Sequence, residues 1–407
     1  GFLRSILLGA LGLLQLTGWA QEMEVSVAGN SAEFMRDAVF SANEKIMVSE
    51  PWGKQLVVWD TSTFRVLTTI ERKGVWSLSP DGKTMAMADN DRHRLDLLNA
   101  SNGKEIASWD WLSDGPRNGH LQTARAPTFR ADGKIEMILS EGNDVGPPEQ
   151  EGGRYQLYGV VLDPSLEGAL IKELPTPLRV GESWPRLFGN GRYLLVEHYI
   201  STKGLNDSGF VEVFDTETGK RIAYKNDRTL ERLRFGEQSA TIVSQATGKW
   251  VVSNFDYASG TVINRGALPI GASECMPFDT PENGRILLMT VGEECRDLAV
   301  YDLQSLRKIA AFAGAGEFGG AALSSDGRWL AGRSCKDWQK SDESAGCKVF
   351  AYDLTAGRMR VEWPVTAESF VGGRASAIVM SPNGTFVAIG ERLMVWNTMS
   401  GRQVVPN

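Results

Sequence analysis

The sequence predicts an all-β protein, a β-propeller of eight four-stranded antiparallel blades, and three observations support this prediction. A short apolar run that ends in an aromatic or aliphatic residue followed by Asp or Asn recurs eight times. The copies lie about 48 residues apart, a period typical of propeller blades. Most repeats also carry turn signals in which Gly follows Asp, Asn or a hydroxyl residue.

The recurring phrase marks the third strand of each unit. Its eight copies are Val58–Asp60, Leu97–Asn99, Val161–Asp163, Val213–Asp215, Asn254–Asp256, Val300–Asp302, Ala351–Asp353 and Val395–Asn397. A turn follows the phrase, as at 216–220, and a more polar fourth strand, such as 221–224, closes the unit. The fourth strand alternates in polarity because one of its sides faces water.

The first turn of each unit joins the first two strands. Six units carry Asp-Gly or Asn-Gly here, at 81–82, 132–133, 190–191, 283–284, 326–327 and 383–384. A compact apolar second strand follows, as at 85–88 and 193–196, which is expected where neighbouring blades pack on both faces. The fifth unit lacks a clear first turn, so seven blades remain the alternative to eight.

The first twenty residues have the pattern of a secretory signal peptide. Arg4 precedes an apolar run at 6–16, and the small residue Ala20 ends the segment. We expect cleavage after Ala20, a single propeller domain at 21–407, and a periplasmic or secreted protein. The apolar run is too short to cross a bilayer comfortably, and no second run is longer. No membrane span is therefore predicted after cleavage of the signal.

The charge balance argues against a nucleic-acid partner. The 407 residues contain 43 Lys and Arg against 50 Asp and Glu, which gives a net charge of −7. Nucleic acids and anionic lipids are bound through a basic footprint. The sequence shows no basic stripe that would supply one.

All four cysteines lie in the last third of the chain, and an exported protein is expected to form disulfides. Cys335 ends a second strand and Cys347 begins the third, which predicts that these two are paired. Cys275 begins a first strand and Cys295 follows the second, so that their ends meet at the same rim. The second predicted disulfide is therefore Cys275–Cys295.

The repeats resemble those of exported bacterial WD-repeat-like and YVTN-type propellers. The resemblance rests on the run 79–83, Ser-Pro-Asp-Gly-Lys, and on aromatic-Asp pairs before Thr/Ser-Gly-Lys/Arg turns, and it covers residues 31–405. It implies a propeller and, by analogy only, a binding role. The Gly-His pair of eukaryotic WD repeats occurs only at Gly119-His120.

Loops between second and third strands should emerge on one face of the propeller, and four are long, at 141–153, 199–209, 334–347 and, to a lesser degree, 89–93. We expect the binding surface there. The candidate binding residues are Trp338, Trp52, His93, His198, Tyr199, Lys336, Asp337 and Asp144. Loop tryptophans carry the most weight because exposed aromatic side chains mark contact surfaces.

Catalytic, metal and cofactor motifs are not evident. His93 and His198 fall at or just past the end of their second strands, which is compatible with a metal or acid–base pair. We interpret them as two unrelated loop histidines. The carboxylates of 141–151 suit calcium, but they lack EF-hand spacing and are interpreted as a solvated loop. No Gly-x-Ser-x-Gly, phosphate-loop, dinucleotide or haem motif is present.

The sequence therefore predicts no catalytic residue, no metal and no cofactor. We expect a non-catalytic scaffold for a protein partner or small ligand, bound on the loop face that carries the disulfides. The alternative is a periplasmic enzyme or enzyme subunit. The nearest analogies that the resemblance offers are a lactonase-like hydrolase and a dehydrogenase large subunit.

Overall fold

The computed structural model describes most of the chain beyond residue 34. The described residues are 35–51, 55–71, 74–113, 121–124, 126–130, 132–141, 156–166, 168–175, 182–188, 191–200, 208–226, 230–235, 239–246, 249–256, 259, 261–271, 277–279, 284–292, 295–315, 321–335, 346–365, 378–389 and 393–405. Contacts divide the chain into Gly1–Ser31 and Ala32–Asn407. The expected cleavage after Ala20 lies outside the described residues and stays a prediction.

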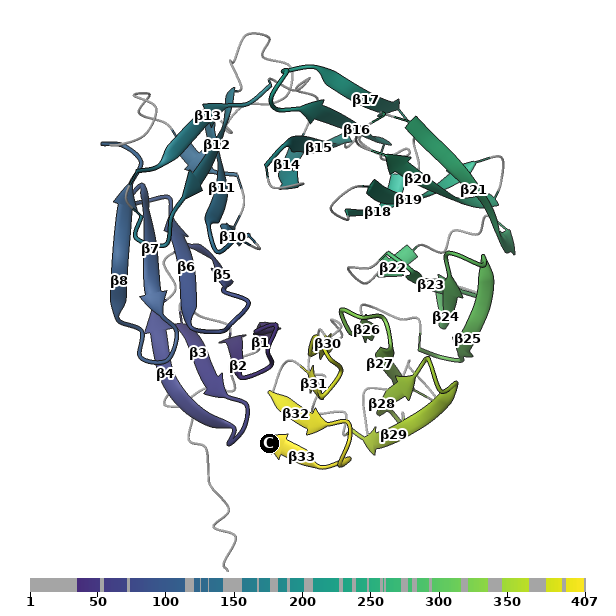
Figure 1. Ribbon diagram of the computed structural model, residues 1–407. Helices are drawn as coiled ribbons and strands as arrows, with labels where there is room; N and C mark the ends of the chain where they lie inside the picture. Colours follow the sequence, from purple (N-terminus) through teal and green to yellow (C-terminus); the bar gives the residue numbers. More distant parts are fainter. Residues whose placement is uncertain are drawn as a thin grey trace, which may run out of the picture. The chain divides into compact units, whose positions relative to one another are not determined.

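The unit Ala32–Asn407 is an eight-bladed β-propeller of antiparallel sheets (Figure 1). Blades 1 to 4 are made of β1 (Met35–Phe40), β2 (Ile46–Pro51), β3 (Gln55–Asp60) and β4 (Arg65–Glu71); β5 (Val75–Leu78), β6 (Thr84–Asp89), β7 (Arg94–Asn99) and β8 (Glu105–Asp110); β9 (Leu121–Thr123), β10 (Thr128–Phe129), β11 (Ile135–Glu141), β12 (Gln156–Leu162) and β13 (Leu170–Glu173); and β14 (Glu182–Phe188), β15 (Tyr193–Ile200), β16 (Ser208–Asp215) and β17 (Arg221–Asn226). Blades 5 to 8 are made of β18 (Leu230–Phe235), β19 (Ser239–Ala246), β20 (Lys249–Asp256) and β21 (Thr261–Gly271); β22 (Pro277–Asp279), β23 (Ile286–Val291), β24 (Asp297–Asp302) and β25 (Arg307–Phe312); β26 (Ala321–Leu323), β27 (Trp329–Ser334), β28 (Lys348–Asp353) and β29 (Arg358–Pro364); and β30 (Ile378–Met380), β31 (Phe386–Ile389), β32 (Met394–Asn397) and β33 (Gln403–Val405).

Each blade is a run of consecutive strands, with the first innermost and the last at the outer edge (Figure 1). The predicted count of eight is confirmed, and every copy of the recurring phrase ends a third strand. Blade 3 differs from the others because its first strand is split. Its two pieces, β9 and β10, pair with opposite ends of β11. Among the described residues, no helix is long and apolar enough to cross a membrane.

The hydrophobic core lies between blades rather than within them. Each main cluster of buried side chains draws on two neighbouring blades, as where Trp329 of blade 7 meets Val387 and Trp396 of blade 8. Other clusters join blades 1 and 2, 2 and 3, 3 and 4, 5 and 6, and 6 and 7. A single blade could not bury its own faces, so the blades are stable only as a set.

The Asp of the recurring phrase ties together both turns on one face of its blade. In blade 6, Asp302 Oδ1 accepts hydrogen bonds from the backbone N–H groups of Gln304 (3.1 Å) and Ser305 (2.7 Å). Its Oδ2 accepts one from Nε of Arg285, which follows the first turn (3.1 Å). Asp353 binds Arg328 in the same way in blade 7. The phrase is therefore a structural signature, which explains why it recurs in every blade.

The hydrogen bonds that these Asp carboxylates accept make the free energy of unfolding depend on pH. Burial raises the pKa of Asp302, but the hydrogen bonds from Ser305 and Arg285 outweigh burial and hold its pKa below the ordinary value. The balance is the same for Asp353, whose pKa is also lowered. A carboxylate with a lowered folded pKa stabilises the fold above its unfolded pKa, near 3.8, and this contribution is lost as pH falls through the folded pKa.

The double variant Asp302→Asn/Asp353→Asn is therefore expected to lose less stability than the wild type between pH 5 and about pH 3. Asn can keep the cap, because Asn397 of blade 8 accepts the same two backbone N–H groups, from Met399 and Ser400. Urea unfolding across this pH range measures the difference. Parallel acid profiles for the two proteins would contradict the assignment.

Blades 8 and 1 meet through side chains, and this contact closes the ring. Strand β30 of blade 8 contacts β1 of blade 1. The Phe386 ring stacks on Phe40 and meets the edge of Phe64, with centroids 6.0 and 5.1 Å apart. The backbone N–H of Asn383 donates to Oε1 of Glu44 (2.6 Å). Every described strand of blade 8 comes from the C-terminal end of the chain.

Candidate functional site

The two faces of the propeller differ in the lengths of their connections. On the face where second strands lead to third strands, the chain between Glu141 and Gln156 and that between Ser334 and Lys348 are the longest. On the opposite face, first turns are as short as those from Phe40 to Ile46 and from Leu78 to Thr84. Long connections on a rigid scaffold are where binding residues concentrate. The binding face expected from the sequence stays a prediction.

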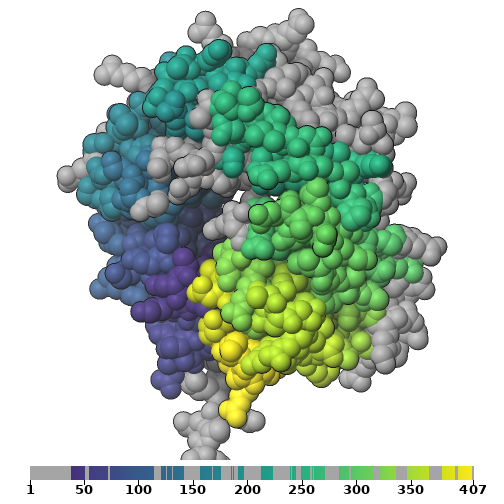
Figure 2. All heavy atoms as spheres, turned by 45° about the vertical axis from the view of Figure 1, so that its right-hand side comes forward, coloured from purple at the N-terminus to yellow at the C-terminus, as the bar shows by residue number. Residues whose placement is uncertain are grey.

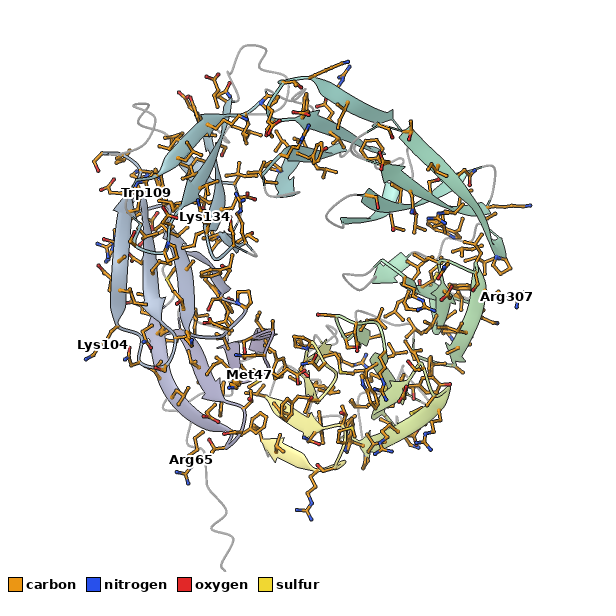
Figure 3. The ribbon with its side chains drawn as sticks, in the orientation of Figure 1. Met47, Arg65, Lys104, Trp109, Lys134 and Arg307 are labelled. Atoms are coloured by element: carbon orange, nitrogen blue, oxygen red, sulfur yellow. A yellow bond between two sulfur atoms is a disulfide. The ribbon has the colours of Figure 1, made fainter. Side chains whose placement is uncertain are left out.

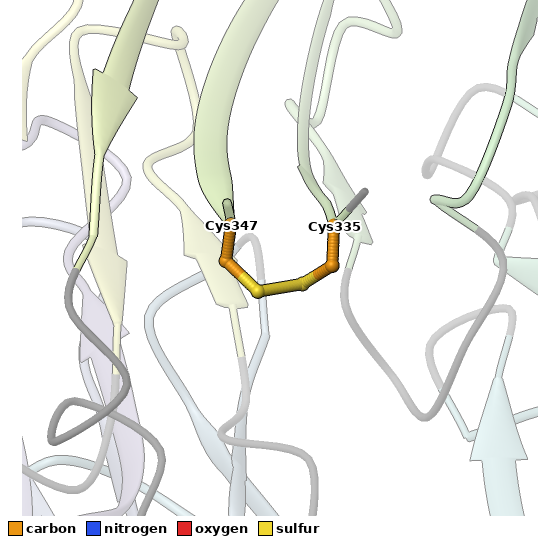
Figure 4. Close-up of a disulfide and its surroundings, with 2 residues drawn as sticks. All are labelled: Cys335 and Cys347. Atoms are coloured by element: carbon orange, nitrogen blue, oxygen red, sulfur yellow. A yellow bond between two sulfur atoms is a disulfide. The ribbon is translucent and has the colours of Figure 1, made fainter. Parts of the chain in front are cut away.

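A disulfide closes one of these long loops at its base. Cys335 and Cys347 are bonded, with Cα atoms 4.0 Å apart, where β27 ends and β28 begins (Figure 4). The predicted pairing is confirmed. No described cysteine is free, but Cys275 lies outside the described residues. The pairing of Cys275 with Cys295 therefore stays a prediction.

Most of the predicted binding residues lie outside the described residues, namely Trp338, Lys336, Asp337, Trp52 and Asp144. Of His198 and Tyr199 the backbone is described. His198 pairs with Ser183 and Phe210 inside β15, because β15 and β16 run further than the sequence pattern indicated. The connection expected at 199–209 therefore runs only from Ile200 to Ser208, and His198 lies within its strand rather than at or just past its end.

His93 lies in the turn between β6 and β7, where its φ of 53° is left-handed. Its ring meets the Trp111 ring edge-on at 6.2 Å, and its carbonyl accepts the Trp111 backbone N–H (3.0 Å). Its Nδ1 is buried, and no described residue donates to it or accepts from it. The strand register places His198 level with Asp89, so the two histidines do not occupy equivalent positions. Among the described residues, no three metal-ligating side chains gather.

Blades 2 and 3 are joined on this face by contacts that the sequence did not reveal. Asn90 Oδ1 accepts hydrogen bonds from the backbone N–H (2.8 Å) and Oγ1 (3.0 Å) of Thr123. Trp111 Nε1 donates to the Leu121 carbonyl (3.2 Å). The short strand β9 that supplies both partners has no periodic pattern, which is why it was missed. The result is a rigid base beneath the loop face next to His93.

The opposite face carries an open cleft of about 570 Å³ between the first turns of blades 1, 2, 7 and 8. Its lining residues are Phe40, Ser41, Ala42, Leu78, Pro80, Ser325, Asp326, Pro382 and Asn383. The turns are bonded to one another: Asn43 N–H donates to the Pro80 carbonyl (3.3 Å) and Ser325 N–H to the Pro382 carbonyl (2.9 Å). The cleft therefore combines the proline and aromatic surface of its lining with polar side chains such as Asp326 and Asn383.

One buried carboxyl group lies near the first turn of blade 3. Burial raises the pKa of Glu136 above its ordinary value, and the guanidinium of Arg130 opposes this shift only in part. Arg130 Nη1 is 3.8 Å from Glu136 Oε2, which has no hydrogen-bond partner in the described structure. Perturbed carboxyls of this kind occur both at functional sites and in structural ion pairs. No convergent histidine or nucleophile accompanies it among the described residues, which favours a structural ion pair.

The fold is similar to solved propeller structures. The WD40 domain of SCAP from fission yeast matches with a TM-score of 0.54 and 13% identity, over 92% of this chain and 97% of that chain. The structure of dihydro-heme d1 dehydrogenase NirN in complex with DHE matches with a TM-score of 0.51 and 13% identity, over 82% of this chain and 67% of that chain. No family model and no curated protein sequence matches this chain. At this identity the likeness shows the fold alone, and the chain is a β-propeller protein.

Proposed function

We propose that this chain is an exported, non-catalytic β-propeller that binds a protein partner or ligand on the face of its second-to-third-strand loops. The observation that carries the proposal is the Cys335–Cys347 disulfide, which holds the base of the 336–346 loop on that face. A bridge at the base of a loop lowers the entropy lost when the loop is ordered by a partner. The signal-like first twenty residues support an exported, periplasmic or secreted location.

The proposed contact surface consists of the sequence-predicted residues around this loop, with Trp338 as its central contact. Trp338, Lys336 and Asp337 lie between the bonded cysteines in the sequence. Tryptophan is among the residue types that are enriched at binding hot spots.

Trp338→Ala is expected to weaken capture of the native partner from the cell envelope by roughly thirtyfold, which corresponds to about 2 kcal/mol. The melting temperature should stay nearly unchanged, because a contact residue adds little to the fold. Leu170→Ala is the matched control, since Leu170 is 67% exposed on the outer strand of blade 3. Retained capture together with a lower melting temperature would show that Trp338 is a packing residue.

A second candidate function is enzymatic, and His93 is the observation that favours it. Its buried Nδ1 has no partner among the described residues, and an imidazole can serve in proton transfer. A lactonase-like hydrolase or a dehydrogenase large subunit are the classes that the repeat resemblance offers. His93→Gln would abolish such an activity, whereas Trp338→Ala should leave it unchanged.

A further inference from the structure

The outer edges of blades 6, 7, 8 and 1 carry cations at one equivalent register. In β25, β29 and β4, Arg307, Arg358 and Arg65 lie directly opposite the Asp that ends the third strand of their blade. In blade 8, the Arg402 carbonyl accepts the backbone N–H of Asn397 (2.9 Å), which places Arg402 at the same level. With two exposed neighbours these residues form what we call the basic arc: Arg307, Lys308, Arg358, Arg360, Arg402 and Arg65.

The arc follows the outside of the propeller. Figure 3 shows Arg307 and Arg65, at its two ends, pointing away from the sheets. Figure 2 shows the green-to-yellow blades 6, 7 and 8 side by side on the side turned toward the reader. All six side chains are exposed. The equal register therefore places residues that are far apart in sequence at one level of the outer edge.

The fold does not use these cations. The two nearest buried carboxylates are already bound by arginines that follow the first turns: Asp302 by Arg285 and Asp353 by Arg328, each at 3.1 Å. None of the six arc cations forms an ion pair with a described residue. Glu362 lies further along β29 and pairs with Lys348 (3.1 Å). The carboxylates of the described residues therefore leave the six arc cations without an ion-pair partner.

Exposed apolar side chains alternate with the cations. Ile309 follows Lys308 and is 42% exposed, and Met359 stands between Arg358 and Arg360 and is 38% exposed. In blade 1, Val66 and Leu67 follow Arg65, and Met399 of blade 8 precedes Arg402. Charges that only protect an edge strand from aggregation have no need of exposed apolar neighbours. The mixture is typical of a surface that contacts another polypeptide.

We propose that the basic arc is a docking surface for an acidic segment of a partner protein that carries apolar side chains among its carboxylates. The charge is complementary in spite of the net charge of −7, because binding depends on the local field. A flat anionic bilayer fits less well, since the arc curves over four blades (Figure 1). The first turns on the same side also expose Asp81 and Asp326, which would repel it. This site is separate from the loop face, and the proposal does not depend on the proposed function.

The test uses the whole chain and a fluorescein-labelled synthetic peptide of Glu residues with interspersed Leu, followed by fluorescence anisotropy. Arg307→Glu/Arg358→Glu/Arg360→Glu should weaken peptide binding by about tenfold or more. The control Lys172→Glu/Lys249→Glu/Arg265→Glu makes the same change in net charge at exposed cations of blades 3 and 5 that are not at this register. It should stay within about twofold of the wild type, and circular dichroism should show that both variants are folded.

A second pair of variants tests the apolar component. Ile309→Ser/Met359→Ser should weaken binding by about threefold while leaving all charges in place. Equal losses in the arc and control charge variants would overturn the proposal in favour of net charge. Tighter binding to phosphatidylglycerol vesicles or to a single-stranded oligonucleotide than to the peptide would overturn it in favour of a membrane or a nucleic acid. Failure of the wild type to bind the peptide would also overturn it.

Discussion

Gly384→Ala is expected to lower the free energy of unfolding by about 2–4 kcal/mol. Gly384 ends the first turn of blade 8 with a left-handed φ of +74°, and a Cβ there would lie 2.3 Å from Cδ1 and 2.4 Å from Cγ of Trp329. Trp329 is buried between blades 7 and 8 and cannot move without opening the cluster that joins them. The loss adds a backbone cost of roughly 1 kcal/mol to overpacking of roughly 1–3 kcal/mol.

Gly357→Ala is the matched control for this prediction. Its φ of +64° is also left-handed, but nothing lies within 4 Å of the Cβ that alanine would add. Only the backbone cost of about 1 kcal/mol is expected. Urea unfolding of both variants isolates the contribution of the contact between blades. Equal losses would mean that Trp329 can move aside and that packing at this boundary tolerates the added methyl group.

Cys335→Ser/Cys347→Ser is expected to lower the free energy of unfolding by roughly 3 kcal/mol. The bond joins residues 12 apart, and removing it returns conformational freedom to the unfolded chain. Urea unfolding under oxidising conditions measures the loss. The strands β27 and β28 remain paired along Trp329–Ser334, so a folded protein is expected.

Reduction of the wild type provides the control for the disulfide variant. A thiol reductant should change the free energy of unfolding of the double serine variant only through its two remaining cysteines, Cys275 and Cys295. In the wild type, the reductant should cause the same change and, in addition, the loss of roughly 3 kcal/mol attributed to Cys335–Cys347. If the double variant is as stable as the oxidised wild type, the bond does not brace the fold. The argument for an ordered loop would then fail as well.

The sequence predicted the features that arise within one blade. The aromatic-Asp phrase and the Asp-Gly turns are short-range, because Asp302 binds backbone groups two and three residues further on. Cys335 and Cys347 close one hairpin, so strand register alone paired them. Counting such local units gave the number of blades. The candidate site was predictable only as a face, because turn patterns do not say where β15 stops and so misplaced His198.

The tertiary structure decided everything that arises between blades. Thr123 meets Asn90, and Gly384 meets Trp329, only because the ring brings neighbouring blades together. The basic arc has the same origin: Arg307, Arg358 and Arg65 are isolated cations in an acidic sequence. Equal register in successive blades places them at one level of the outer edge. Local interactions can be predicted from short stretches of sequence, because their partners are only a few residues apart. A surface shared by several blades depends instead on how the repeats are arranged in space.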